Sequence, residues 1–240
     1  MTGEITTICS RTSDIVRKTG DKMEREIAEK GIVLSAVPYG EYGKRIVILT
    51  ANLGRITAFA NSIRKQTSRL TPAGQSFVMG EFRLRPGRDS YNLISADVEE
   101  SFIELSWDIE KYGLASYFCE FINYYTREGL AAKDELNLLY LAFKALLNDS
   151  IDDRTVRLIF ELKLMDIEGE VPEISAFTKI TPDESFVLGN ILSLPIVKVF
   201  SFNLEESLLI RMEEISRSLI KKNVDIRFKS LEVMKGINVT

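Results

Sequence analysis

The chain has 240 residues, of which 45% are hydrophobic and 28% are charged, and its formal net charge is -4, a composition typical of one large or two small globular domains. It has no histidine and only two cysteines, Cys9 and Cys119, which excludes His-dependent nucleophilic catalysis, most zinc sites and a disulfide framework. Since it also lacks a run of about 18 apolar residues and a secretory signal, we expect a cytoplasmic protein without a catalytic residue, metal or cofactor.

Five short strands are predicted in the first half of the chain, at residues 31–38, 44–50, 54–61, 77–85 and 91–101. They are rich in β-branched and aromatic residues, and the connections between them carry the Gly, Pro and Asn of tight turns. Gly80, inside the fourth strand, indicates a bulge or a sharp bend. Five strands with a longer insertion at residues 62–76, between the third and the fourth, match an OB-fold barrel, which we assign to residues 30–105.

Positive charge is concentrated in this segment. Residues 30–90 hold ten Lys and Arg against three Asp and Glu, a net charge of +7, whereas residues 97–184 carry -12. A charge excess is usually a solvated face, but in an acidic protein that repels polyanions this local excess favours a phosphate-binding surface. The expected DNA-binding residues are Lys44, Arg45, Arg55, Arg64, Lys65, Arg69, Arg83, Arg85 and Arg88.

Alternation along the strands indicates which basic side chains face solvent, because successive residues point to opposite sides of a strand. In the fourth strand, Arg83 and Arg85 share the polar side and are expected to be exposed. In the third strand, Arg55 shares one side with Phe59, and a cation beside a ring is the combination that binds single strands without sequence preference. Phe59 in the barrel interior is an equally good interpretation, since aromatic rings often complete a core.

The insertion brings Arg64, Lys65 and Arg69 to the edge of the barrel, and no acidic residue occurs between Asn61 and Gly80. We expect this segment to act as a basic clamp, because Lys and Arg neutralise backbone phosphates. A connector that is merely soluble is the alternative interpretation.

After Ser101 the apolar period changes from 2 to about 3.6, which predicts an all-α domain over residues 106–240. The first helix is expected to begin with a Ser106 cap and to end near Arg127, and the next two begin near Asp134 and Asp152. The third helix is apolar around much of its surface and is expected to be central to the bundle. Its apolar residues are Val156, Leu158, Ile159, Phe160, Leu162, Leu164, Met165 and Ile167.

Two later helices are predicted from capping motifs at residues 181–184 and 203–206. The second of them is long and ends near Asn223. Carboxylates at helical spacing in the acidic segment, such as Asp166, Glu168 and Glu170, have no partner base or metal motif and are interpreted as solvated.

The end of the last long helix and the segment after it are basic again and are interspersed with apolar residues. Such a rim can receive the acidic and apolar end of a partner peptide, although a helix C-terminus favours Lys and Arg through its dipole alone. The residues concerned are Arg217, Lys221, Lys222, Arg227 and Lys229.

Taken in order, residues 31–70 and 77–102 resemble the N-terminal domain of the RecO family of recombinational DNA-repair mediators, and residues 157–174 and 227–234 resemble its central helix and closing segment. The resemblance covers about residues 30–235 and implies an OB-fold barrel followed by an all-α domain. It also implies binding of single- and double-stranded DNA, strand annealing, and loading of a recombinase onto DNA covered by single-stranded-DNA-binding protein. The implied partners are RecR and the C-terminal tail of that protein, and the implied place is the nucleoid, without enzymatic activity.

The chain departs from this family in two places. Many relatives carry a four-cysteine zinc module after the central helix, whereas residues 170–181 contain no cysteine, so no metal is expected. Relatives also tend to begin a few residues before the first strand, so residues 1–29 are expected to be a disordered leader or to follow from a start that belongs at Met23. Two other functions stay open, an adaptor whose barrel binds an acidic protein and a hydrolase with paired carboxylates.

Overall fold

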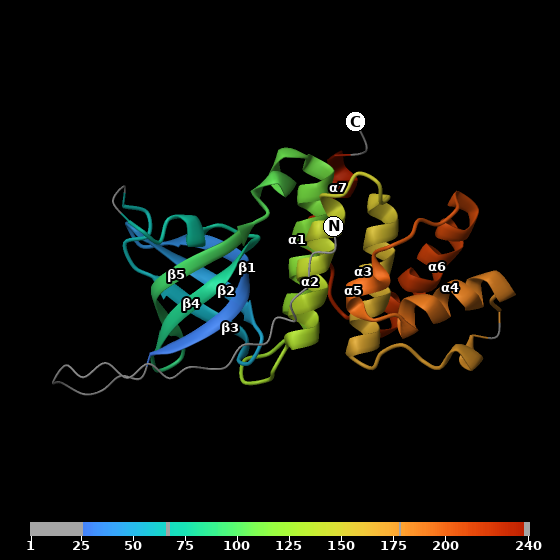
Figure 1. The fold of residues 1–240 in the computed structure, drawn as a ribbon, viewed down its shortest axis with the longest axis horizontal. Coiled ribbons are helices and arrows are strands. Elements are labelled where there is room, and N and C mark those ends of the chain that lie inside the picture. Colours follow the sequence, from blue (N-terminus) through green and yellow to red (C-terminus); the bar gives the residue numbers. More distant parts are fainter. Residues whose placement is uncertain (1–25, 66–67, 178, 238–240) are drawn as a thin grey trace, which may run out of the picture. The chain divides into compact units, whose positions relative to one another are not determined.

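The computed structural model describes residues 26–65, 68–177 and 179–237, which form two compact units (Figure 1). One unit ends at Ser101 and also includes Glu128–Ala131. The other comprises Phe102–Arg127 and the chain from Ala132 onward. The predicted α+β class is confirmed, because the first unit contains the strands and the second contains the helices.

The five strands of the first unit close into a barrel. They are β1 (Ile27–Tyr39), β2 (Gly43–Thr50), β3 (Gly54–Ala60), β4 (Val78–Pro86) and β5 (Tyr91–Ser101), in the order β1-β2-β3-β5-β4. Neighbours are antiparallel except for β3 and β5, which are parallel. This is the five-stranded OB-fold barrel that the sequence predicted.

β1 is longer than predicted and begins at Ile27 instead of Gly31. Its first half pairs with β4 and its second half with β2, and the register shifts between Val33 and Ser35, as a bulge does where a strand bends from one neighbour to the next. The end of the predicted leader therefore belongs to a strand, while its residues 1–25 lie outside the described residues.

The predicted irregularity at Gly80 is confirmed. The register between β4 and β5 shifts between Met79 and Gly80. A Cβ atom on Gly80 would lie 2.3 Å from the carbonyl oxygen of Asp97, so the close approach of these two backbones requires glycine.

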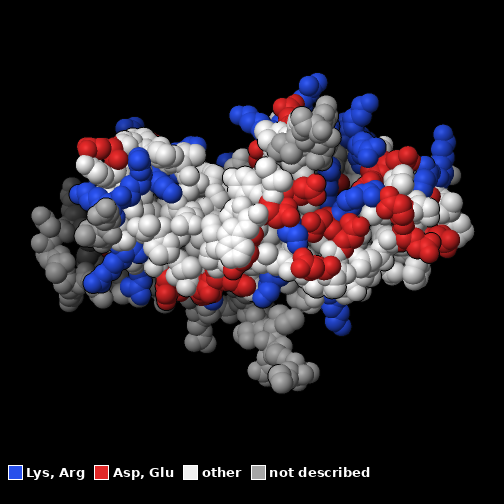
Figure 2. All heavy atoms as spheres, turned by 90° about the horizontal axis from the view of Figure 1, so that it is seen from above, with Lys and Arg blue, Asp and Glu red and all other residues white. Residues whose placement is uncertain are grey.

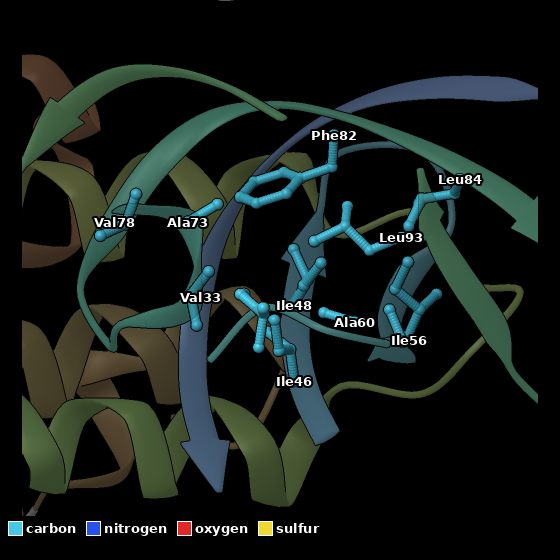
Figure 3. Packing of buried hydrophobic residues seen from close by; sticks show 12 residues of the cluster. Val33, Ile46, Ile48, Ile56, Ala60, Ala73, Val78, Phe82, Leu84 and Leu93 are labelled. Atoms are coloured by element: carbon cyan, nitrogen blue, oxygen red, sulfur yellow. The ribbon is translucent and has the colours of Figure 1, made fainter. Parts of the chain in front are cut away.

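The barrel interior is filled by alternate side chains of its strands (Figure 3). Ile46 and Ile48 of β2 face Ile56 of β3, and Phe82 and Leu84 of β4 close the other side. All five are fully buried, and burying a side chain of this size contributes about 1.5–3 kcal/mol each.

The second unit is helical. Its α-helices are α1 (Ile109–Tyr125), α2 (Lys133–Leu146), α3 (Asp153–Ile167), α4 (Pro182–Ser193), α5 (Ile196–Val199), α6 (Glu206–Asn223) and α7 (Lys229–Ile237). Short 3-10 turns occur at Ile103–Trp107 and Ile174–Ala176, and a third, Pro72–Gly74, belongs to the barrel unit. Among the residues described, no helix is long and apolar enough to span a membrane.

Two of the predicted helix starts are wrong. Ser106 does not cap α1, because it lies in a 3-10 turn where its hydroxyl donates to the Ile103 carbonyl, and Asp108 accepts the first helical N–H groups instead. Asn203 does not cap α6, because its side chain bonds the backbone of Ser150 and Asp152 between α2 and α3.

The capping box predicted at residues 181–184 is confirmed. The Thr181 hydroxyl accepts from the Glu184 N–H, and the Glu184 carboxylate accepts from the Thr181 N–H. The position of α3 is also as predicted: it packs against α1, α2, α4 and α6, and its apolar residues are buried apart from the half-buried Ile167.

Candidate nucleic-acid interface

A row of outward-facing side chains crosses all five strands of the barrel. The register joins Val37 to Arg45, Arg45 to Phe59, Phe59 to Asn92, and Asn92 to Arg85. Cross-strand neighbours lie about 5 Å apart, so these side chains form one continuous band, called here the outer row. No single strand carries more than one of them.

Phe59 belongs to the surface of the barrel and not to its interior. In β3 the inward positions are taken by Ile56, Ala58 and Ala60, which leaves Phe59 half-buried on the outer side. Its ring centroid lies 4.7 Å from that of Tyr39, which is 56% exposed. The two rings form an accessible aromatic platform.

A cation lies directly beside this platform. Arg45 is exposed and is the cross-strand neighbour of Phe59 on β2. A guanidinium next to rings can bind a phosphate while a base stacks on the aromatic face.

The insertion between β3 and β4 adds further positive charge. The Arg64 N–H donates to the Tyr42 carbonyl at 2.9 Å, and the Lys65 ammonium lies 5.4 Å from the centre of the Tyr42 ring. Tyr42 belongs to the turn between β1 and β2, so these contacts bring the insertion to that end of the barrel. Arg64, Lys65 and Arg69 are all exposed.

Lys44 differs from its neighbour Arg45. It is half-buried, and its ammonium donates to the carbonyl oxygen of Gly74 in the insertion at 2.5 Å. Its charged group is therefore engaged within the protein, apart from the exposed cations.

Arg83 and Arg85 share the outer side of β4, opposite Phe82 and Leu84, as predicted, but the expectation that both are exposed is wrong. Both are half-buried, and Arg85 forms an ion pair with Glu26 at 3.0 Å. The reason is the early start of β1, which brings Glu26 beside the end of β4.

The two remaining basic residues lie in different surroundings. Arg55 is half-buried in β3, paired in register with Leu49 of β2. Arg88 lies in the turn between β4 and β5, where its side chain is 95% exposed and 4.0 Å from Asp89. On the face seen in Figure 2, Lys and Arg side chains form groups over the barrel unit with a few Asp and Glu side chains beside them, and both signs of charge also mix over the helical unit.

Two family models match the chain: Recombination protein O N terminal over residues 23–102, and Recombination protein O C terminal over residues 107–176. The chain belongs to the RecO family. The first match covers the closed barrel, and the second covers α1 to α3 and the turn that follows.

Similar proteins carry the name DNA repair protein RecO. The one from Alkaliphilus metalliredigens is 31% identical over 62% of this chain and 61% of its own length. Those from Clostridium acetobutylicum and Acetivibrio thermocellus are each 26% identical over 87% of this chain and 96% of their own length.

The helical unit of this RecO-family chain contains a pocket of about 650 Å³. Its apolar lining includes Ile220 of α6 and Phe228, Leu231 and Met234 in and just before α7. Its charged lining consists of Arg154, Arg157, Glu161, Glu213, Arg217 and Lys235. Four cations against two carboxylates give the pocket a net positive charge.

The pocket shares one residue, Arg217, with the basic rim predicted for a partner peptide. Lys221, Lys222, Arg227 and Lys229 are exposed but are not part of its lining. Sequence reasoning missed Arg154, Arg157 and Lys235, since these come from α3 and α7 and meet only in the folded unit.

Glu161 fixes the floor of the pocket. This carboxylate is 4% exposed and accepts from the Tyr117 hydroxyl at 2.9 Å, the Ser216 hydroxyl at 2.6 Å and Arg157 Nε at 2.8 Å. A buried carboxylate is costly unless it keeps its hydrogen-bond partners. The bond between Glu161 and Arg157 Nε therefore holds the Arg157 guanidinium in one orientation at the pocket. In residues 26–65, 68–177 and 179–237, no three or more His, Cys, Asp or Glu side chains group as they do around a metal ion.

Proposed function

We propose that this chain is a DNA-repair protein that binds single- and double-stranded DNA through the outer surface of its barrel. The observation that carries the proposal is the position of the exposed Arg45 directly beside the ring pair of Phe59 and Tyr39. The interface, called here the barrel surface, consists of Val37, Tyr39, Tyr42, Arg45, Phe59, Arg64, Lys65, Arg69, Arg85 and Asn92.

The chemistry of this surface suits binding without sequence preference. Cations neutralise backbone phosphates whatever the base, and every base has a face that stacks on a ring. Since neither contact uses the Watson–Crick edges, a strand held in this way keeps them available for a complementary strand. We infer that this is how the protein promotes annealing, without covalent chemistry or a cofactor.

The helical unit supplies the contact with protein partners in this proposal. An excess of positive charge beside the apolar side chains of the same pocket fits the acidic and apolar C-terminal tail of single-stranded-DNA-binding protein. Binding this tail and DNA at once would bring the protein to covered single strands in the nucleoid, where it helps to load a recombinase together with RecR.

The proposal is tested by titrating fluorescent single-stranded DNA at several salt concentrations. We expect the logarithm of the affinity to fall linearly with the logarithm of the salt concentration, by about 0.7 for each phosphate contact, and Arg45→Ala to lower this slope by about one contact. An affinity that does not depend on salt contradicts the proposal. Binding of an acidic protein in the absence of any DNA binding supports the adaptor instead.

A further inference from the structure

The insertion between β3 and β4 begins and ends on residues in the left-handed region of backbone conformation. Ser62 has a φ of 66° and Phe77 a φ of 67°. Residues with a side chain adopt this region rarely, and bulky ones least of all, so surrounding contacts must hold both ends. At Phe77 the ring is buried and the N–H donates to the Val33 carbonyl at 2.8 Å.

The described part of the insertion is folded on itself. The Thr71 hydroxyl shares its one proton between the carbonyls of Ile63 and Ser68, at 3.1 and 3.0 Å. Ile63 is buried and packs so closely on Gly74 that a Cβ there would lie 2.5 Å from the Ile63 side chain. These contacts hold the described residues on either side of residues 66–67 together, so that few points of attachment to the barrel are needed.

Lys44 supplies one such attachment. Its ammonium donates to the Gly74 carbonyl, and its Cδ atom lies 3.5 Å from where a Gly74 Cβ would be. The next residue on β2, Arg45, points to the opposite side of the strand and is exposed. Two adjacent cations therefore have different surroundings, since the half-buried Lys44 is bonded to the insertion and Arg45 is exposed to solvent.

We propose that Lys44 is a positioning residue, which fastens the insertion to the barrel so that Arg64, Lys65 and Arg69 face the nucleic acid together. This inference rests on the proposed DNA binding of the same surface. In this inference Lys44 makes no phosphate contact of its own. Lys44 affects DNA binding only because it positions the three cations of the insertion.

The test compares Lys44→Met with Arg45→Ala by two measurements on the full chain. The first is the rate of tryptic cleavage after Arg64, Lys65 and Arg69, which needs no DNA. We expect Lys44→Met to speed this cleavage roughly 2- to 10-fold, because a lost hydrogen bond raises the population of the open segment by that factor, and Arg45→Ala to leave it unchanged.

The second measurement is the salt dependence of single-strand binding. Arg45→Ala is expected to remove one contact from the slope, about 0.7, whereas Lys44→Met weakens the contacts of all three insertion cations and is expected to lower the slope by more than one contact, up to the effect of replacing Arg64, Lys65 and Arg69 by alanine. Adding Lys44→Met to that triple variant then changes nothing further. Lys44→Arg keeps a donor for the carbonyl and is expected to restore both the protection and the slope.

Thr71→Val is a second test in case the Lys44 variant fails to fold, because it removes hydrogen bonds within the same insertion. It is expected to speed tryptic cleavage and to lower the salt slope in the same way. The inference is overturned if Lys44→Met is cleaved by trypsin no faster than the parent and loses only one phosphate contact from the salt slope. Lys44 would then be a direct phosphate ligand. Faster cleavage in a protein that does not bind DNA supports the attachment and contradicts the proposed function.

Discussion

Phe59 and Phe82 show how the same residue type has different roles on the two sides of one barrel. Phe82 is fully buried in the core, whereas Phe59 lies half-buried on the outer side against Tyr39. The alternation of polar and apolar residues in β3 placed Phe59 on the polar, outer side. The sequence still left a core position open, because an aromatic ring also suits a barrel interior. The register settles it, since the inward positions of β3 are filled by smaller side chains.

We therefore expect Phe59→Ala to lower single-strand affinity by about 1–3 kcal/mol, since one stacking face is lost, with little change in the melting temperature. Phe82→Ala is the matched control and is expected to cost about 3–5 kcal/mol of stability, because it opens a cavity in the core. Fluorescence titration and thermal melts measure the two effects. A large loss of stability in Phe59→Ala with unchanged affinity contradicts the stacking role.

Glu168, at the end of α3, is not the solvated carboxylate that helical spacing suggested. Burial, followed by the charge of Glu135 at the start of α2, raises its pKa to about 7. Glu170 adds to this effect and Arg127 opposes it. Because the pKa in the folded state lies above the unfolded value near 4.5, the folded state binds the proton more tightly, and stability falls as the pH rises from about 4.5 through 7.

We expect Glu168→Gln to remove this dependence and to raise the free energy of unfolding at pH 8 by about 1 kcal/mol, an amount that allows for solvent screening at a half-buried site. At pH 4 the variant and the parent are expected to be equally stable. Urea unfolding at the two pH values measures the difference, with the exposed Glu173→Gln as control. Equal stability of parent and variant at pH 8 would show that Glu168 titrates normally.

At the scale of elements, the sequence predicted what depends on local pattern. The five strands and α3 follow from period and turn residues, and Gly80 from its place inside a strand. The predicted caps at Ser106 and Asn203 were wrong because each side chain has a competing hydrogen-bond partner. Ser106 bonds within a 3-10 turn, and Asn203 bonds the segment between α2 and α3. The sequence did not predict which residues form the outer row, because the row depends on strand order and register.

The pairing of β1 with β4 carries a prediction for Arg85. Its ion pair with Glu26 neutralises part of its charge, so Arg85→Ala is expected to change the salt slope of DNA binding less than Arg45→Ala does. Glu26→Gln removes the opposing carboxylate and is expected to tighten binding and to steepen the slope by up to about 0.7. Glu99→Gln is the matched control, because it breaks the ion pair between Glu99 of β5 and Lys30 of β1. If Arg85→Ala lowers the slope as much as Arg45→Ala, the ion pair does not hold in solution.

At the scale of the whole molecule, charge separates the two proposed activities. Residues 30–90 carry +7 and residues 97–184 carry -12, yet the helical unit gathers four cations around one pocket. Composition predicted the first fact but not the second, because Lys235 of α7 lies far in the sequence from Arg154 and Arg157 of α3 and meets them only in the folded unit. The rim predicted at the end of the chain therefore splits into Arg217, which lines the pocket, and four residues that do not.

This split gives a direct test of the proposed peptide site. Arg217→Glu places a carboxylate in the pocket lining and is expected to weaken binding of an acidic C-terminal peptide of single-stranded-DNA-binding protein at least about tenfold, because like charges repel at close range. Lys222→Glu makes the same change of charge on the same helix outside the lining, where water and salt screen it, and is expected to have little effect. Both variants should bind DNA with the parental affinity and salt slope, since their charges lie outside the barrel surface. Fluorescence anisotropy with labelled peptide and labelled DNA measures both. Equal losses of peptide binding in the two variants would mean that overall charge, and not the pocket, attracts the peptide.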